Sequence, residues 1–155
     1  MSRVVLDANI YVKLFKAESD SQKAKQLMNS LIQNHSHIME PSIAISETIT
    51  ICEANKINVE SPCDFFGALL DSVIQVIEVD YHLIKKSLDI MRIGHVKSGY
   101  PTFNDSLYHA IAIRDKAIFI TADRRHYVKI KHLGNIMLLE KNSGPQLLDN
   151  QETVY

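Results

Sequence analysis

The sequence predicts an α/β fold with a central, mostly parallel sheet of four to five strands flanked by helices. Two observations predict it. Short apolar segments rich in β-branched residues alternate along the chain with longer segments of helical periodicity. The 155 residues suffice for one domain with a substantial core and are too few for two ordinary domains. We expect this domain to span residues 1–142, followed by a polar and mobile tail at residues 143–155.

The N-terminal third is expected to contain two strands with helices between them. The first strand is expected at residues 4–6 and is followed by a helix at residues 10–16. A longer helix is expected at residues 19–34, where apolar side chains recur at the spacing of an amphipathic helix. These side chains are Ala24, Leu27, Met28, Leu31 and Ile32. A short strand follows at residues 37–39.

The middle of the chain contains two helix starts and one strand. Pro41-Ser42 is expected to cap a helix that runs to about residue 56. Ser61-Pro62 has the pattern of an N-cap followed by proline at the first helical position, so another helix is expected to begin there. Residues 73–79 are rich in β-branched side chains and are expected to form the next strand.

The following segment is expected to be helix, loop and helix. Asp80 can cap a helix that ends near Gly94. Residues 94–103 contain glycine and proline and are expected to form a loop. A helix is then expected at residues 104–116.

The C-terminal third is expected to complete the sheet. An apolar strand is expected at residues 117–121, and a helix at residues 127–133 with Gly134 as its stop. The last strand is expected at residues 136–139.

The composition is that of a globular protein without a broad basic surface. The chain is 46% hydrophobic and 23% charged, with a net charge of -1. Nucleic acid remains a possible partner, because a bound metal can supply positive charge that the side chains lack. Cys52 and Cys63 fit no zinc pattern and are expected to be reduced thiols in the core. With neither a secretory leader nor a membrane-spanning apolar run in the sequence, we expect a cytoplasmic protein.

Four acids occupy positions from which they could meet at one edge of the sheet. Asp7 and Asp123 follow predicted strands, whereas Glu47 and Asp105 lie on predicted helices. Each has an ordinary explanation: Asp7 and Asp123 can cap the next helix, and Asp105 suits a helix N-terminus. Glu47 is less ordinary, because apolar residues lie four positions before and after it.

If these four acids converge, their charges favour a bound cation. Two carboxylates about 4 Å apart repel by roughly 4 kcal/mol at an effective dielectric constant near 20. The protein can relieve that cost by raising a pKa, by separating the acids or by binding a cation. A site of oxygen ligands alone favours Mg²⁺ or Mn²⁺ over zinc.

The motifs that carry these acids resemble those of the PIN-domain ribonucleases, and among them the small VapC-type toxins. The motifs are Leu6-Asp7-Ala8-Asn9, Pro41-Ser42 with Ser46-Glu47, Asn104-Asp105-Ser106 through Ala112, and Ile120-Thr121-Ala122-Asp123. The resemblance extends from about residue 3 to residue 139. It implies that Asp7, Glu47, Asp105 and Asp123 form a catalytic metal site, which Asn9 and Thr121 line. Ser106 departs from the pattern, since alanine is frequent after the third acid.

This resemblance also implies an activity and partners. It implies an endoribonuclease that depends on Mg²⁺ or Mn²⁺ and leaves 5′-phosphate and 3′-hydroxyl ends. The protein would be the toxin of a toxin–antitoxin pair, with an antitoxin protein as partner and a homodimeric state. Arg124 and Arg125 could hold RNA phosphates, with Lys129 and Lys131 nearby, although a solvated helix face explains them equally well.

Two other functions stay open from the sequence. A phosphatase of the haloacid-dehalogenase type also uses an aspartate at a strand end, but it needs a second acid two residues later, where this chain has Asn9. A non-catalytic binding module with a PIN-like fold would use the acids only as helix caps. His109, four residues after Asp105, is expected to be a packing residue and is left out of the site.

Overall fold

The computed structural model describes residues 2–139, which form a five-stranded, all-parallel sheet with helices on both faces. The predicted α/β class is therefore confirmed. The strands are β1 (Arg3–Leu6), β2 (His37–Pro41), β3 (Ile74–Ile77), β4 (Ile118–Thr121) and β5 (Ile136–Leu138). The expected tail at residues 143–155 lies outside the described residues.

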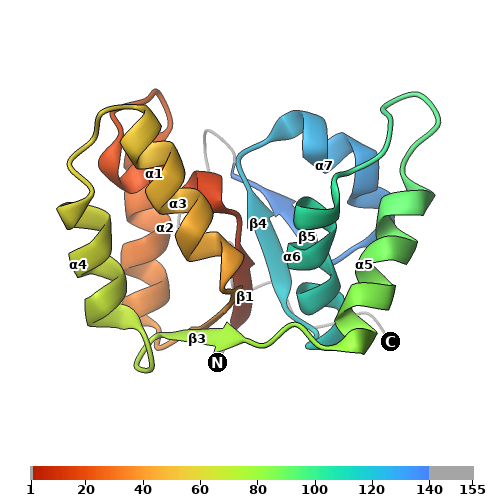
Figure 1. Ribbon diagram of the computed structural model, residues 1–155, viewed down its shortest axis with the longest axis horizontal. Helices are drawn as coiled ribbons and strands as arrows, with labels where there is room; N and C mark the ends of the chain where they lie inside the picture. Colours follow the sequence, from red (N-terminus) through yellow and green to blue (C-terminus); the bar gives the residue numbers. More distant parts are fainter. Residues whose placement is uncertain (1, 140–155) are drawn as a thin grey trace.

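Seven α-helices and one short 3₁₀ helix connect these strands within residues 2–139. They are α1 (Ala8–Phe15), α2 (Ser21–Gln33), α3 (Ile43–Ala54), α4 (Glu60–Leu69), α5 (Tyr81–Ile93), α6 (Phe103–Arg114), α7 (Arg124–Ile130) and η1 (Lys131–Leu133). Figure 1 shows α1 to α4 on one side of β1 and α5 to α7 on the other. None of these helices is long and apolar enough to cross a bilayer.

The alternation of side chains along β1 divides the core into two clusters. Val4 and Leu6 pack with buried residues of α1, α2 and α4. Val5 packs on the opposite face with buried residues of α5 and α6. Successive side chains of a strand point to opposite faces, so an uninterrupted apolar strand is expected at the centre of a sheet covered on both sides.

The strand order β3-β2-β1-β4-β5 creates a switch point between β1 and β4. The chain adds β2 and β3 on one side of β1 and then returns to add β4 and β5 on the other. Ligand sites of open α/β sheets lie beyond the carboxyl ends of the strands at such a point. Leu6 pairs with Ile120 in this register, so Asp7 and Thr121 come to the same edge.

Every predicted helix and strand is present, but several of their bounds differ. α4 begins at Glu60, so Ser61 and Pro62 lie inside its first turn and are not its cap and first residue. Ser42 precedes α3 but makes no side-chain capping hydrogen bond. The helix predicted at residues 127–133 begins earlier, at Arg124, because Asp123 caps it.

The prediction for the cysteines is right for one residue and wrong for the other. Both thiols are free, but only Cys52 lies in the core, whereas Cys63 is exposed on α4. Cys63 follows the buried Pro62 by one residue, so the helix turns its side chain away from the core.

Candidate active site

Asp7 is a buried carboxylate at the switch point. Its side chain accepts hydrogen bonds from the Thr121 hydroxyl at 2.7 Å and from the Asn9 backbone N–H at 3.2 Å. Burial raises the pKa of Asp7 to about 7, against the opposing effect of these two hydrogen bonds, and the charges of Asp105 and Glu47 raise it further. A nearby cation would therefore relieve a carboxylate whose charge is costly here.

Asn9 and Thr121 fix this carboxylate between β4 and the start of α1. The Thr121 hydroxyl donates to Asp7 and accepts from the Asn9 amide at 3.3 Å and from the Asp123 backbone N–H at 3.0 Å. One proton and two lone pairs are all that a hydroxyl offers, so Thr121 is fully used. The Asn9 carbonyl oxygen in turn accepts from the Ala122 N–H at 3.1 Å.

Asp123 caps α7, as the ordinary explanation of this residue predicted. Its Oδ1 accepts from the backbone N–H groups of Arg125 at 2.8 Å and His126 at 3.2 Å. Capping uses only one of the two carboxylate oxygens. Asp123 is half-buried and lies at the same edge as Asp7. A capping role and a ligand role are therefore compatible for Asp123.

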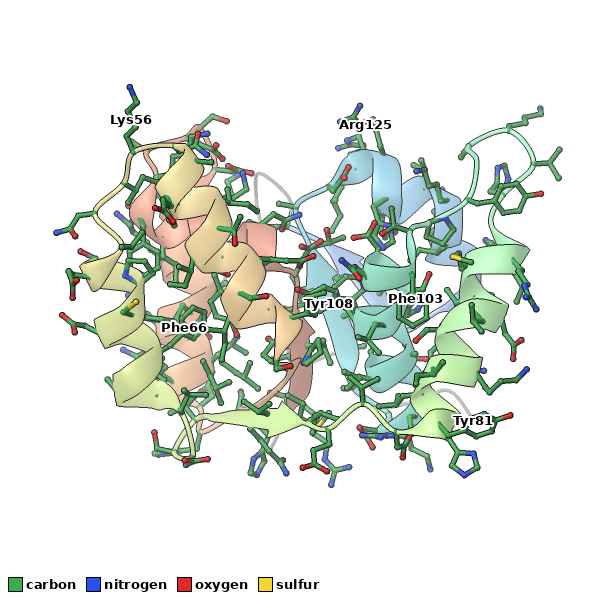
Figure 2. The ribbon with its side chains drawn as sticks, in the orientation of Figure 1. Lys56, Phe66, Tyr81, Phe103, Tyr108 and Arg125 are labelled. Carbon is green, nitrogen blue, oxygen red and sulfur yellow. The ribbon has the colours of Figure 1, made fainter. Side chains whose placement is uncertain are left out.

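Glu47 joins α3 to α6. Its Oε1 accepts from the Asn104 amide at 3.1 Å, and its Oε2 accepts from the Tyr108 hydroxyl at 2.7 Å. Tyr108 lies between these two helices in Figure 2, and burial, followed by the bond to Glu47, raises the pKa of its phenol. The hydrogen bonds thus turn Glu47 toward α6.

The apolar stripe proposed around Glu47 is wrong. The buried residues of α3 are Ala44, Thr48 and Cys52, whereas Ile51 is exposed. Glu47 itself is half-buried. The sequence suggested this position for the wrong reason, because α3 turns a different face toward the core.

Asp105 lies in the first turn of α6, where the Thr102 hydroxyl oxygen caps the helix by accepting from the Asp105 N–H at 3.2 Å. Its side chain is 34% exposed, and the Oδ2 atom lies 3.6 Å from Nδ1 of His126. The carboxylate is therefore accessible from solvent and faces a buried imidazole.

The four predicted acids share one edge of the molecule but do not surround a common point. Asp7 feels the charges of Glu47 and Asp105, and Asp123 is connected to Asp7 through Thr121. Among residues 2–139, no three His, Cys, Asp or Glu side chains are arranged closely enough to hold an ion. Nor does any Lys or Arg of this range form an ion pair with one of the four acids. The chemistry of the donors, all oxygen and without a basic partner, fits a divalent cation of the Mg²⁺ type.

Glu40 is a buried acid beside this site that sequence reasoning missed. Its Oε1 accepts from the Leu6 N–H and from the Tyr11 hydroxyl, both at 2.8 Å. Its Oε2 is buried and has no hydrogen-bond partner among the described residues. Burial raises the pKa of Glu40 well above its usual value, against the opposing effect of its two hydrogen bonds. An acid within the apolar run of β2 was the available signal.

His126 was also missed. It lies in the first turn of α7, is 2% exposed, and has two ring nitrogens without a hydrogen-bond partner among the described residues. Its position three residues after Asp123 was visible in the sequence, but only the fold shows that its ring faces Asp105.

His109 is a packing residue, as its position on α6 predicted. It is fully buried, and its Nε2 lies 2.6 Å from the Gly134 carbonyl oxygen. A carbonyl only accepts, so we assign the proton of the neutral ring to Nε2. Burial lowers the pKa of His109 to about 4, which keeps the ring neutral at physiological pH.

Arg124 and Arg125 are exposed at the beginning of α7, next to Asp123 in the sequence. Arg125 projects from the end of the molecule at which α7 begins, as Figure 2 shows. Neither guanidinium forms an ion pair with a residue in the described range. Both groups are therefore available to an anionic partner.

Fold and site together define a class: an all-parallel α/β domain with a buried aspartate at the switch point of the sheet and further acids along the same edge. The PIN domain family model matches residues 4–132. The chain therefore belongs to the PIN domain family. This match spans four of the five strands and all four predicted acids.

Three solved structures illustrate the same fold. A toxin–antitoxin complex from Klebsiella pneumoniae has a TM-score of 0.62 at 15% identity, over 90% of this chain and 99% of that chain. VapC20 of Mycobacterium tuberculosis, a toxin that cleaves the sarcin–ricin loop, has a TM-score of 0.59 at 15% identity over 74% and 84%. VapBC2 of Rickettsia felis, bound to a DNA fragment from its promoter, has a TM-score of 0.62 at 19% identity over 88% and 96%.

At these identities the likeness concerns the fold. No protein with a curated description matches the sequence.

Proposed function

We propose that this protein is an endoribonuclease that depends on Mg²⁺ or Mn²⁺ and acts as the toxin of a toxin–antitoxin pair. It hydrolyses RNA phosphodiester bonds and leaves 5′-phosphate and 3′-hydroxyl ends. The observation that carries the proposal is the buried Asp7 at the switch point, within reach of the charges of Glu47 and Asp105. Membership of the PIN domain family supports it.

All four acids would take part in holding the cation in this scheme. Asp7 and Asp105 would hold the cation as direct ligands, Asp123 would hold it directly or through water, and Glu47 would hold it or orient the attacking water. When bound, a divalent ion supplies an acidic water and stabilises negative charge on the leaving oxygen. Thr121 and Asn9 hold Asp7 in place through the hydrogen bonds described above.

The partners of the proposed toxin are RNA, an antitoxin protein and a second copy of the chain. Arg124 and Arg125 contact the RNA phosphates, since both are exposed and lie beside Asp123. Toxin–antitoxin complexes among the structures of similar fold support an antitoxin. We place the protein in the cytoplasm, where RNA and an antitoxin would meet it.

Cleavage of total cellular RNA tests the proposal. The wild-type protein should cut RNA with Mg²⁺ or Mn²⁺ and lose this activity when EDTA is added. Asp7→Asn should abolish cleavage and keep the fold, because an amide retains the shape and loses the charge. The product ends are checked by ligation, which requires a 5′-phosphate. Cleavage that persists in EDTA, or full activity of Asp7→Asn, would count against the scheme.

A non-catalytic binding module is the second candidate. The observation that favours it is that both Asp7 and Asp123 cap helices, which is a sufficient structural reason for each. A titration with Mn²⁺ separates the two candidates, because a pair of caps has no affinity for the ion. The haloacid-dehalogenase alternative loses its basis, since the chain belongs to another family.

A further inference from the structure

His126 is a buried polar side chain whose hydrogen-bonding capacity is unused. It is 2% exposed, and neither ring nitrogen has a partner among residues 2–139. Native proteins pair nearly all their buried polar groups, so an unpaired one calls for a specific reason. Its ring packs at 65° against Phe119 with centroids 5.7 Å apart, which fixes the imidazole plane.

The groups that face this imidazole identify its partner. The residues whose charges influence the pKa of His126 are Asp105, Asp123 and Lys129. The Oδ2 atom of Asp105 lies 3.6 Å from the Nδ1 atom of His126. This distance exceeds that of a hydrogen bond. The Asp105 side chain is 34% exposed, however, so a rotation that moves its oxygen by less than about 1 Å completes the bond.

The backbone of His126 is held by a second acid of the site. Its N–H donates to Asp123 Oδ1 at 3.2 Å. The ring is thus fixed relative to Asp123 on one side and faces Asp105 on the other. Asp123 lies between β4 and α7, whereas Asp105 belongs to α6. His126, on α7, therefore lies between the end of β4 and the start of α6.

We propose that His126 is a positioning residue, whose Nδ1–H holds the Asp105 carboxylate in the orientation that a divalent cation requires. The inference rests on the proposed metal-dependent function. One oxygen of Asp105 accepts from the imidazole, and the other is directed toward the cation. Hydrogen bonds of this kind orient the ligands of metal sites, and their loss typically lowers metal affinity by about 10- to 100-fold.

Three substitutions of His126 separate this role from packing. In His126→Asn the amide nitrogen takes nearly the position of Nδ1, whereas in His126→Gln it reaches the position of Nε2. His126→Phe keeps the ring against Phe119 and removes both nitrogens. Affinity for Mn²⁺ is measured by isothermal titration calorimetry without RNA, and thermal unfolding is recorded for each variant. We expect the Phe and Gln variants to bind Mn²⁺ about 10- to 100-fold more weakly and the Asn variant within about threefold of the wild type.

His109→Phe is the matched control, because His109 is equally buried and its Nε2 faces the Gly134 carbonyl oxygen, not an acid. It should change the melting temperature and leave Mn²⁺ affinity unaltered. Wild-type affinity in His126→Phe, or equal losses in the Asn and Gln variants, would overturn the inference while the proposed function stands. If His126→Phe does not fold, the comparison of Asn with Gln decides. Absence of Mn²⁺ binding by the wild type would instead remove the proposed function, and the inference with it.

Discussion

Asp7 serves the fold and the proposed chemistry in ways that oppose each other. As a helix cap it accepts the Asn9 N–H, which favours a carboxylate. As a buried group it resists ionisation, and burial is the larger effect, because the pKa rises from 3.8 to about 7. Its ionised form is therefore the form that destabilises the folded protein when no cation is bound.

This ionisation gives a testable dependence of stability on pH. Unfolded Asp7 loses its proton near pH 3.8, whereas folded Asp7 keeps it until about pH 7. Because the pKa of Asp7 is raised in the folded protein, Asp7 contributes its full share of the free energy of unfolding below the unfolded pKa. This contribution is lost as the pH rises toward 7. In EDTA, Asp7→Asn should therefore gain free energy of unfolding relative to the wild type between pH 5 and pH 8, by roughly 3 kcal/mol. Urea denaturation at both pH values measures it.

Asp64→Asn is the matched control for this measurement, since Asp64 is exposed and lies on α4, a helix that carries none of the four acids. Its difference from the wild type should stay constant with pH. A constant difference for Asp7→Asn as well would contradict a raised pKa of Asp7.

At the scale of elements, Glu40 connects β2 to β1 and α1. In the register of β1 and β2, Arg3 pairs with His37 and Val4 pairs with Ile38. Two residues further on, the Glu40 side chain takes the place of a backbone carbonyl and accepts the Leu6 N–H. The end of β1 that carries Asp7 is thus held by a side chain of the neighbouring strand.

Substitutions of Glu40 should separate its hydrogen bonds from its charge. Glu40→Gln keeps an acceptor for Leu6 and Tyr11 and should change the free energy of unfolding by less than about 1 kcal/mol. Glu40→Leu leaves both donors unpaired in the core and should cost about 2–5 kcal/mol. Chemical denaturation compares the two variants. Equal losses in both would show that the carboxyl group is required for something other than accepting these bonds.

Prediction from sequence succeeded where a local signal sets the structure. Asp80 caps α5 by accepting the Leu83 N–H at 2.8 Å, as its position after a strand predicted. The start of α7 was placed too late, although Asp123 carried the same kind of signal. Contacts of Glu40 and His126 depend on the register of strands and the packing of distant helices, so no local pattern could reveal them.

At the scale of the whole molecule, the proposed function would divide the task of binding RNA between the acidic edge and the arginines of α7. The chain has a net charge of -1 and therefore offers no general attraction to a polyanion. Arg124 and Arg125 are exposed beside Asp123. Attraction to phosphates would thus be local and close to the proposed point of cleavage.

The salt dependence of RNA binding tests this division. In an Asp7→Asn background, replacing Arg124 and Arg125 by Ala should weaken binding of single-stranded RNA. It should also reduce the slope of log affinity against log salt by about 0.7 for each lost phosphate contact. Fluorescence anisotropy at several KCl concentrations measures both. The same loss on replacing the exposed Lys25 and Lys85 by Ala would indicate a general charge effect.

The neighbour of β1 at the switch point is β4, the fourth strand to be synthesised. Until translation has passed Thr121, the first strand lacks the hydroxyl that holds Asp7, and the fourth acid, Asp123, has not yet been synthesised. The pairing of β1 with β4, which lie far apart in the sequence, also slows folding, because a long segment must be ordered before the two strands meet. For a nuclease of the proposed kind, an incomplete chain would therefore be harmless to its own cell, and hydrolytic competence would arise only when the polypeptide is almost finished.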